Sequence, residues 1–91
     1  MTIRTKFFAY FREIFGGRDR DLSLPDGASV GDALALLADT PARRGELFAG
    51  DELKPHLVVM LNGVPVQSSQ GLATPLSEGD TLAVFPMMGG G

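Results

Sequence analysis

Few side chains in this sequence have a type and spacing that could carry out catalysis. The single histidine, His56, has no second histidine and no local carboxylate pair with which to share a metal ion or a proton. Ser68-Ser69 lacks the flanking glycines of a nucleophile elbow, and the chain contains no cysteine. The acidic residues are scattered along loops, without the paired, apolar setting that tunes a carboxyl group for acid–base catalysis. We therefore expect no catalytic side chain, and no metal or cofactor bound by this chain.

The C-terminus is the one place left for chemistry. Its last seven residues, 85–91, read FPMMGGG. Proline ends a strand and glycine is entropically costly to order, so residues 86–91 should protrude as a flexible tail. Six extended residues span at most about 20 Å, which is long enough to bring the terminal carboxylate into another protein's active site. Glycines fit a narrow channel, and the flexible, apolar Met87 and Met88 suit a partner's groove. Composition alone also allows a frayed tail without function.

The strands that would hold this tail follow from the spacing of the apolar residues. Alternating or β-rich apolar runs predict strands over residues 3–7, 21–24, 57–61 and 81–85. The strand over 21–24 is expected to pair with the first strand. Asn62-Gly63 is a strong signal for a two-residue hairpin turn, after which Val64-Pro65-Val66 would begin a short return strand.

One main helix is predicted between these strands. Ser29 offers an N-cap with Asp32 three residues later, a variant of the capping box, and apolar residues then follow at helical spacing. We expect Thr40-Pro41 to close this helix. Apolar residues three and four apart also predict a short helical turn over 10–15. Residues 41–56 mix proline, glycine and charges, which indicates a loop carrying one helical turn.

The order of these elements predicts the fold class. Ninety-one residues make one domain with one small core. A hairpin, a crossing helix and a returning hairpin place one layer of helix on one layer of sheet, which is the α+β class. The β-grasp is the known architecture with this order. We expect a mixed sheet of four to five strands packed on one main helix, with residues 1–91 as a single domain and 86–91 as its tail.

The sequence resembles a known family over nearly its whole length. That family is the MoaD/ThiS family of ubiquitin-like sulfur carriers. Its closing motif is matched, two residues before a terminal glycine run, by Leu76, Gly79-Asp80, Leu82 and Val84-Phe85-Pro86. The segments 8–17 and 29–38 and the hairpin over 58–66 also look like their counterparts in this family.

The resemblance implies that the function resides at the terminal glycines. In the family an ATP-dependent adenylating enzyme, MoeB/ThiF-like, activates the terminal carboxylate, which is here that of Gly91. Sulfur from a persulfide donor then displaces AMP and leaves a thiocarboxylate. The residues expected to thread into the partner are Pro86, Met87, Met88, Gly89 and Gly90. Length and the Phe85-Pro86 ending favour the MoaD branch, in which the chain is the non-catalytic small subunit of molybdopterin synthase beside a MoaE-like large subunit.

Other functions stay open at this point. Met87-Met88-Gly89 stands where the MoaD branch more commonly has Pro-Val-Ala or Pro-Val-Thr, and residues 41–55 form a longer segment than in the shortest members. Both departures leave the chemistry intact. The sulfur acceptor could therefore belong to the synthesis of thiamine thiazole or of cysteine, and the pterin cofactor could carry tungsten. A ubiquitin-like modifier that forms isopeptides and a noncovalent binding module are further alternatives.

A carrier also needs a surface with which to bind its enzymes. The helix should cover only one side of the sheet, so apolar residues on the other side would form an exposed patch. We expect Phe8, Leu61 and Phe85, together with Met87, to form this docking patch. The alternative for Phe8 and Phe85 is that they belong to the core.

Charge and hydropathy exclude several kinds of partner. With 8 Lys and Arg against 11 Asp and Glu, the net charge is −3, so no basic field is available to hold nucleic acid or anionic lipid. The N-terminal residues lack the run of roughly seven apolar residues that a secretory signal needs. We therefore expect a cytoplasmic protein whose partner is another protein or a small molecule.

Overall fold

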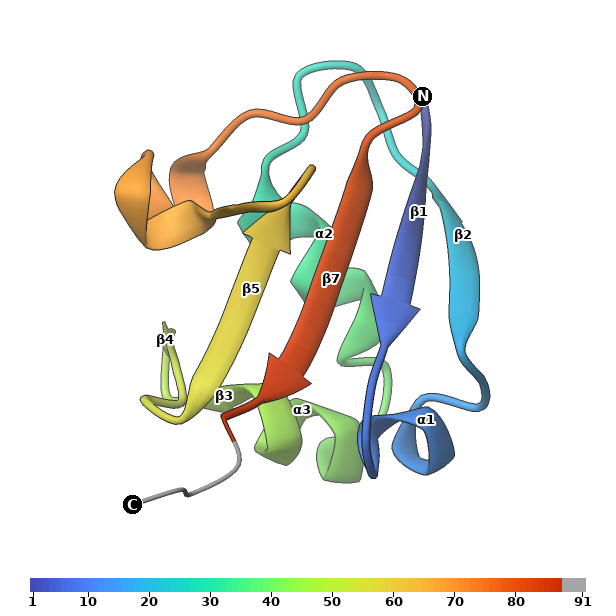
Figure 1. Cartoon of the computed structure of the whole chain (residues 1–91), viewed down its shortest axis with the longest axis vertical. Helices are drawn as coiled ribbons and strands as arrows, with labels where there is room; N and C mark the ends of the chain where they lie inside the picture. Colours follow the sequence, from blue (N-terminus) through green and yellow to red (C-terminus); the bar gives the residue numbers. More distant parts are fainter. Residues whose placement is uncertain (88–91) are drawn as a thin grey trace.

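Five strands form one mixed sheet in the computed structural model of this chain, which describes residues 1–87 (Figure 1). The strands are β1 Thr2–Phe7, β2 Asp19–Ser23, β5 Leu57–Leu61, β6 Val64–Pro65 and β7 Thr81–Pro86. Their order across the sheet is β2-β1-β7-β5-β6, with β1 and β7 parallel and the other neighbours antiparallel. The C-terminal strand β7 therefore lies at the centre of the sheet.

The main helix, α2 over Val30–Leu37, covers one face of this sheet. Ser29 caps it as predicted, because its hydroxyl accepts a hydrogen bond from the Asp32 amide at 3.3 Å and the Asp32 carboxylate accepts one from the Ser29 amide at 2.8 Å. This reciprocal cap satisfies amides that the first helical turn leaves without partners. The side chains that α2 buries are Val30, Ala33, Leu34 and Leu37.

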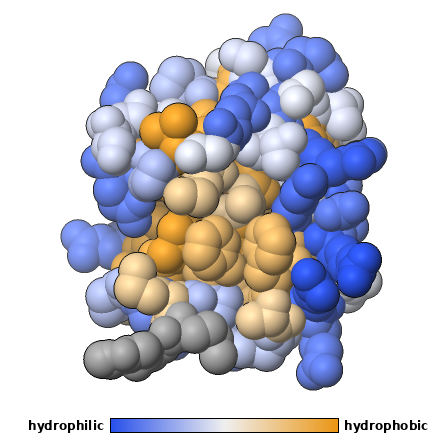
Figure 2. All heavy atoms as spheres, viewed as in Figure 1, coloured by the Kyte–Doolittle hydropathy of each residue, from blue (hydrophilic) through white to orange (hydrophobic). Residues whose placement is uncertain are grey.

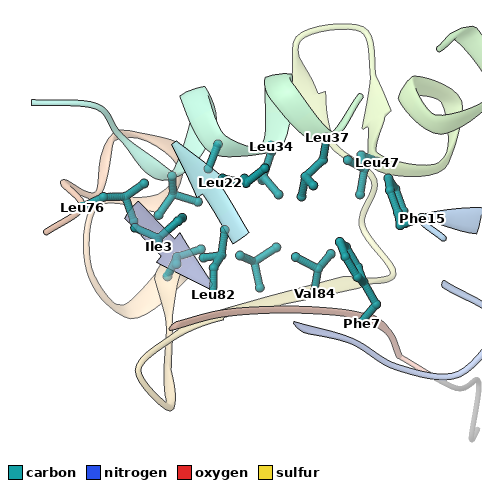
Figure 3. Close-up of a cluster of buried hydrophobic side chains, with 14 of the residues drawn as sticks. Ile3, Phe7, Phe15, Leu22, Leu34, Leu37, Leu47, Leu76, Leu82 and Val84 are labelled. Carbon is teal, nitrogen blue, oxygen red and sulfur yellow. The ribbon is translucent and has the colours of Figure 1, made fainter. Parts of the chain in front are cut away.

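The core fills the space between α2 and the sheet (Figure 3). Leu82 and Val84 of β7 point toward Leu34 of α2, and all three are fully buried. At one end of this layer the ring of Phe7 stacks on that of Phe15, with centroids 4.8 Å apart and planes at 9°. The open face of the sheet contributes nothing to this core.

Residues 41–56 are more regular than the sequence predicted. They form helix α3, Pro41–Leu47, and a small antiparallel hairpin of β3, Phe48–Ala49, and β4, Glu52–Leu53. Thr40 caps α3, because its hydroxyl accepts from the Arg43 amide at 3.1 Å, and Pro41 stands in the first turn. The expectation of a loop with one helical turn is wrong. Thr40-Pro41 follows α2 and also begins a second helix, because threonine is a good N-cap and proline is tolerated in the first turn.

Three shorter helical segments complete the secondary structure that the structure describes. They are α1, Phe11–Ile14, and two 3-10 turns, η1 Val66–Ser68 and η2 Gly71–Ala73. Helix α1 confirms the turn predicted over 10–15 and buries Phe11 completely. The predicted strands are confirmed to within two residues at each end, and so are the α+β class and the sheet of five strands on one main helix.

Candidate functional site

The C-terminal strand is held in the sheet up to the last residue that the structure describes. Pro86 lies opposite Leu57 of β5 and is buried. The amide of Met87 donates a hydrogen bond to the carbonyl of His56 at 2.6 Å. The prediction that Pro86 already belongs to a protruding tail is therefore wrong.

Proline is compatible with this position because its missing N–H would face β1 rather than β5. Alternate residues of a strand turn their amides toward opposite neighbours, and the Met87 amide already bonds to the chain at the start of β5. Strand β1 pairs with β7 only as far as Phe7 and Val84. The ladder therefore loses no hydrogen bond at Pro86.

The residues expected to react come after this anchor. Gly91 and the preceding Met88, Gly89 and Gly90, which are four residues of the flexible tail predicted over 86–91, lie outside the described residues. Met87 is 65% exposed. The described part of the site is therefore the end of β7 and Met87, which residues 88–91 follow in the sequence.

The face of the sheet that α2 leaves open is apolar over β5 and β7. The register places Val58 opposite Phe85 and Met60 opposite Ala83, so these four side chains share one face. Their neighbours along the strands, such as Val84, are buried on the other face. Figure 2 shows apolar residues gathered on this open face, in the view in which β5 and β7 lie in front.

Phe8, the residue after β1, extends this apolar surface. Its ring meets the ring of Phe85 edge-on, with centroids 5.6 Å apart and planes at 81°. The two rings line an apolar hollow of about 270 Å³. Phe8 is 39% exposed, so it lies at the surface and not in the core. Its role in docking stays a prediction, as does that of Phe85.

Two neighbours position Phe8. Ala9 has a φ of 55°, a left-handed conformation that is unusual for alanine, and so turns the chain sharply after Phe8. Arg12 donates a hydrogen bond from Nε to the Phe7 carbonyl at 3.2 Å. Its guanidinium carbon lies 5.9 Å from the centre of the Phe8 ring, within the range of a cation–π contact.

Leu61 lies on the opposite face of the sheet from Phe8 and Phe85. It pairs with Leu82, which is fully buried, and packs against the core. The expectation that Leu61 joins the open-face patch is wrong, because successive strand residues alternate between faces and Leu61 has the same parity as the buried Val59.

Val58 and Met60 hold the positions on the open face that the sequence analysis gave to Leu61. They were missed because the run LVVML in β5 is apolar throughout and shows no alternation from which a face could be read. The pairing of β5 with β7 decides the face, and this pairing joins segments that lie far apart in the sequence.

No group of metal-ligating side chains lies near this surface in the described part of the chain. Among residues 1–87, no three His, Cys, Asp or Glu side chains come together in a way that could hold a metal ion. His56 is exposed, and the structure gives its backbone carbonyl, as the acceptor for Met87, a role at the site. Within the same part of the chain, no helix has the length and apolar character needed to cross a membrane. The site therefore consists of an apolar surface and an anchored chain end.

A mixed five-stranded sheet on one main helix, with the C-terminal strand at its centre, defines a ubiquitin-like β-grasp protein. The model of the ThiS family matches residues 5–91, and the chain belongs to this family of ubiquitin-like sulfur carriers and modifiers.

Known relatives and solved structures are similar to this chain along nearly its whole length. Small archaeal modifier protein 3 of Haloferax volcanii is 40% identical over 92 residues, which cover 100% of both chains. The crystal structure of SAMP1 from the same organism has a TM-score of 0.85 at 34% identity and covers 100% of both chains.

Two more distant structures carry names of other kinds. A putative molybdopterin converting factor, subunit 1, from Pyrococcus furiosus has a TM-score of 0.74 at 25% identity, covering 94% of this chain and 97% of that one. A chain in the Amycolatopsis orientalis BexX/CysO complex has a TM-score of 0.71 at 27% identity, covering 98% and 99%. A family member has thus been seen bound to another protein.

Proposed function

We propose that this chain is a sulfur carrier that donates sulfur for the dithiolene of molybdopterin. One observation carries the proposal. The apolar surface around Phe8 and Phe85 adjoins the anchored end of β7, from which a short glycine-ended segment leads to the carboxylate of Gly91. The likeness to a putative molybdopterin converting factor supports this choice of sulfur acceptor.

The chemistry begins with activation of the Gly91 carboxylate. An ionised carboxylate is a poor electrophile, so an adenylating enzyme joins it to AMP from ATP and releases pyrophosphate. The terminal sulfur of a protein persulfide attacks the acyl carbon, and AMP leaves. A second thiol then cleaves the sulfur–sulfur bond, which leaves the thiocarboxylate on Gly91 and a disulfide between the two thiols. The pterin precursor bound by the large subunit of molybdopterin synthase would receive this sulfur.

In this scheme the chain supplies the surface that docks on the partner and the length needed to bring its carboxylate to the partner's reacting centre. Docking through Phe8 and Phe85 would hold the end of β7 in a fixed place on the partner. Residues 88–91 add at most about 14 Å beyond Met87, so the reacting centre of each partner would lie within that distance of Met87. Gly89 and Gly90 present no side chain to a narrow channel. Both partners would be met in the cytoplasm.

A second candidate function is protein modification. It is favoured by the relative at 40% identity, which is named a modifier protein. The same acyl-adenylate would react with a lysine amine of another protein to give an isopeptide bond, again with loss of AMP. Sulfur donation for thiamine thiazole or cysteine synthesis uses the same thiocarboxylate and differs only in the acceptor.

The test is the intact mass of the chain after incubation with an adenylating enzyme, ATP and a persulfide donor. We expect the mass gain that accompanies exchange of one oxygen for sulfur, and molybdopterin once precursor and large subunit are added. Deletion of Gly91, or Gly90→Ile, should reduce both at least about a hundredfold, because a displacement of about 1 Å at a reacting centre can cost that much.

We expect folding to be unaffected by these changes, because substitutions away from a packed core usually cost no more than about 0.5 kcal/mol, and thermal unfolding of each variant checks this. Gly45→Ala, on the exposed side of α3, is the matched control and should keep full activity. A thiocarboxylate that forms without supporting molybdopterin would direct the search to another acceptor. Adducts on lysines of other proteins, without a thiocarboxylate, would favour the modifier function.

A further inference from the structure

Three cationic side chains line a hollow beside the apolar surface. Lys6, Arg12 and Arg18 line it together with Phe7, Phe8 and Asp19, around a volume of about 280 Å³. All three cations are exposed. Among residues 1–87, none of them is within ion-pair distance of a carboxylate. Figure 2 shows hydrophilic residues bordering the apolar patch on the side of β1 and β2.

The charge of this hollow is opposite to that of the whole chain. The chain has a net charge of −3, whereas the hollow holds three cations against the single carboxylate of Asp19. Arg4 and Asp21 on the same face form an ion pair with atoms 3.2 Å apart, so their opposite charges largely cancel. A partner that approaches the open face therefore meets an apolar centre with a positive border on the side of β1 and β2.

Arg12 lines the cationic hollow and also contacts the apolar surface at Phe8. Its Nε is fixed on the Phe7 carbonyl and its guanidinium lies near the Phe8 ring. One of its five N–H donors is used in this hydrogen bond, so the guanidinium can still bind a carboxylate through the others. A partner side chain that reaches Arg12 would stand beside a partner group that covers Phe8.

We propose that Lys6, Arg12 and Arg18 receive aspartate or glutamate side chains of the protein that docks on Phe8 and Phe85. This inference rests on the proposed function and names the chemistry of its partner: an apolar surface bordered by carboxylates on one side. A protein fits better than a nucleic acid, because the adjoining Phe8–Phe85 hollow is wholly apolar and Asp19 and Asp21 would repel a phosphate backbone.

Charges at the border of an interface act mainly on the rate of association. At low ionic strength, Lys6→Glu and Arg18→Glu should each slow association with the adenylating enzyme about tenfold. The dissociation rate should change by less than about twofold, and the salt dependence of association should flatten. Stopped-flow fluorescence at about 0.01 M and about 0.15 M ionic strength measures both effects.

Arg44→Glu is the matched control, because it makes the same change in net charge on α3. Arg44 is exposed, and its contact is with the Phe48 ring, 5.1 Å away, not with the open face. Its association rate should stay within about twofold of the wild-type rate. Thermal unfolding of all variants checks that each is folded.

Equal association rates for the three variants would overturn the inference. The proposed function would still stand in that case if the wild-type chain is thiocarboxylated. A wild-type chain without any mass change would contradict the proposed function, whatever the association rates are. Binding of inorganic phosphate or a short RNA to the wild-type hollow at physiological salt would also overturn the inference, because the site would then hold phosphate and not partner carboxylates.

Discussion

Phe7 and Phe8 are adjacent in the sequence but belong to opposite faces of the sheet. Phe7 is 1% exposed and stacks on Phe15 in the core beneath α2. Phe8 is 39% exposed and meets Phe85 at the surface. Removal of apolar area from water explains why folding needs Phe7. It explains less of Phe8, which keeps 39% of its surface in contact with water after folding.

The same contrast runs along β7. Leu82 and Val84 face α2 and are fully buried, whereas Ala83 and Phe85 face outward with Val58 and Met60 of β5. Contiguous apolar side chains on an open face mark a surface that a partner covers. Substitutions on the covered face should therefore mainly lower stability, whereas substitutions on the open face should mainly weaken binding.

The largest effect on stability should come from the covered face. Phe7→Ala removes a fully buried ring from the contact with Phe15 and leaves a cavity, so we expect a loss of about 3–5 kcal/mol in the free energy of unfolding. Urea denaturation followed by circular dichroism measures it. Phe7→Leu, which keeps most of the apolar volume, should cost clearly less. A loss below about 1 kcal/mol for Phe7→Ala would show that the two faces do not differ as described.

The open face should show the reverse pattern. Phe8→Ala removes the edge-on contact with Phe85, so we expect a loss of about 0.5–1.5 kcal/mol in stability. Its affinity for the adenylating enzyme, measured by calorimetry, should fall at least about tenfold, as for an aromatic residue at the centre of an interface. Leu36→Ala is a control on α2, because Leu36 is 45% exposed and lies outside this face. An unchanged affinity for Phe8→Ala would remove the open face from the docking model.

Local signals explain why most of the covered face could be predicted from the sequence. The Ser29 and Asp32 cap and the Asn62-Gly63 turn each act within four residues, and each has the predicted form in the structure. Helix α3 was missed because Thr40-Pro41 is equally suited to follow one helix and to begin another.

The open face was harder to predict because pairing between distant segments decides it. Leu61 and Met60 are both apolar, and only the register of β5 on β7 puts Met60 beside Ala83 and Leu61 beside Leu82. Pro86 was placed in the tail because proline usually ends a strand. The sequence alone does not show that β1 stops short of it, so that its missing N–H costs no ladder bond.

The smallest effect should come from a charge cluster at the rim of the covered face. A hydrogen bond from Arg43 to Asp39, at 2.8 Å, is the main cause that lowers the pKa of the Asp39 carboxyl below 3.8, and the charges of Arg43 and Arg20 add to it. Because the pKa is lowered in the folded state, the stabilisation is present above 3.8 and is lost as the pH falls through the folded value. The carboxylate is solvated, so the contribution is small. Asp39→Asn should therefore lower the urea midpoint slightly at about pH 6 and by a smaller amount at about pH 3, whereas Asp51→Asn at the exposed β3–β4 turn should change neither. An equal loss for Asp39→Asn at both pH values would assign Asp39 a role in packing that its ionisation does not control.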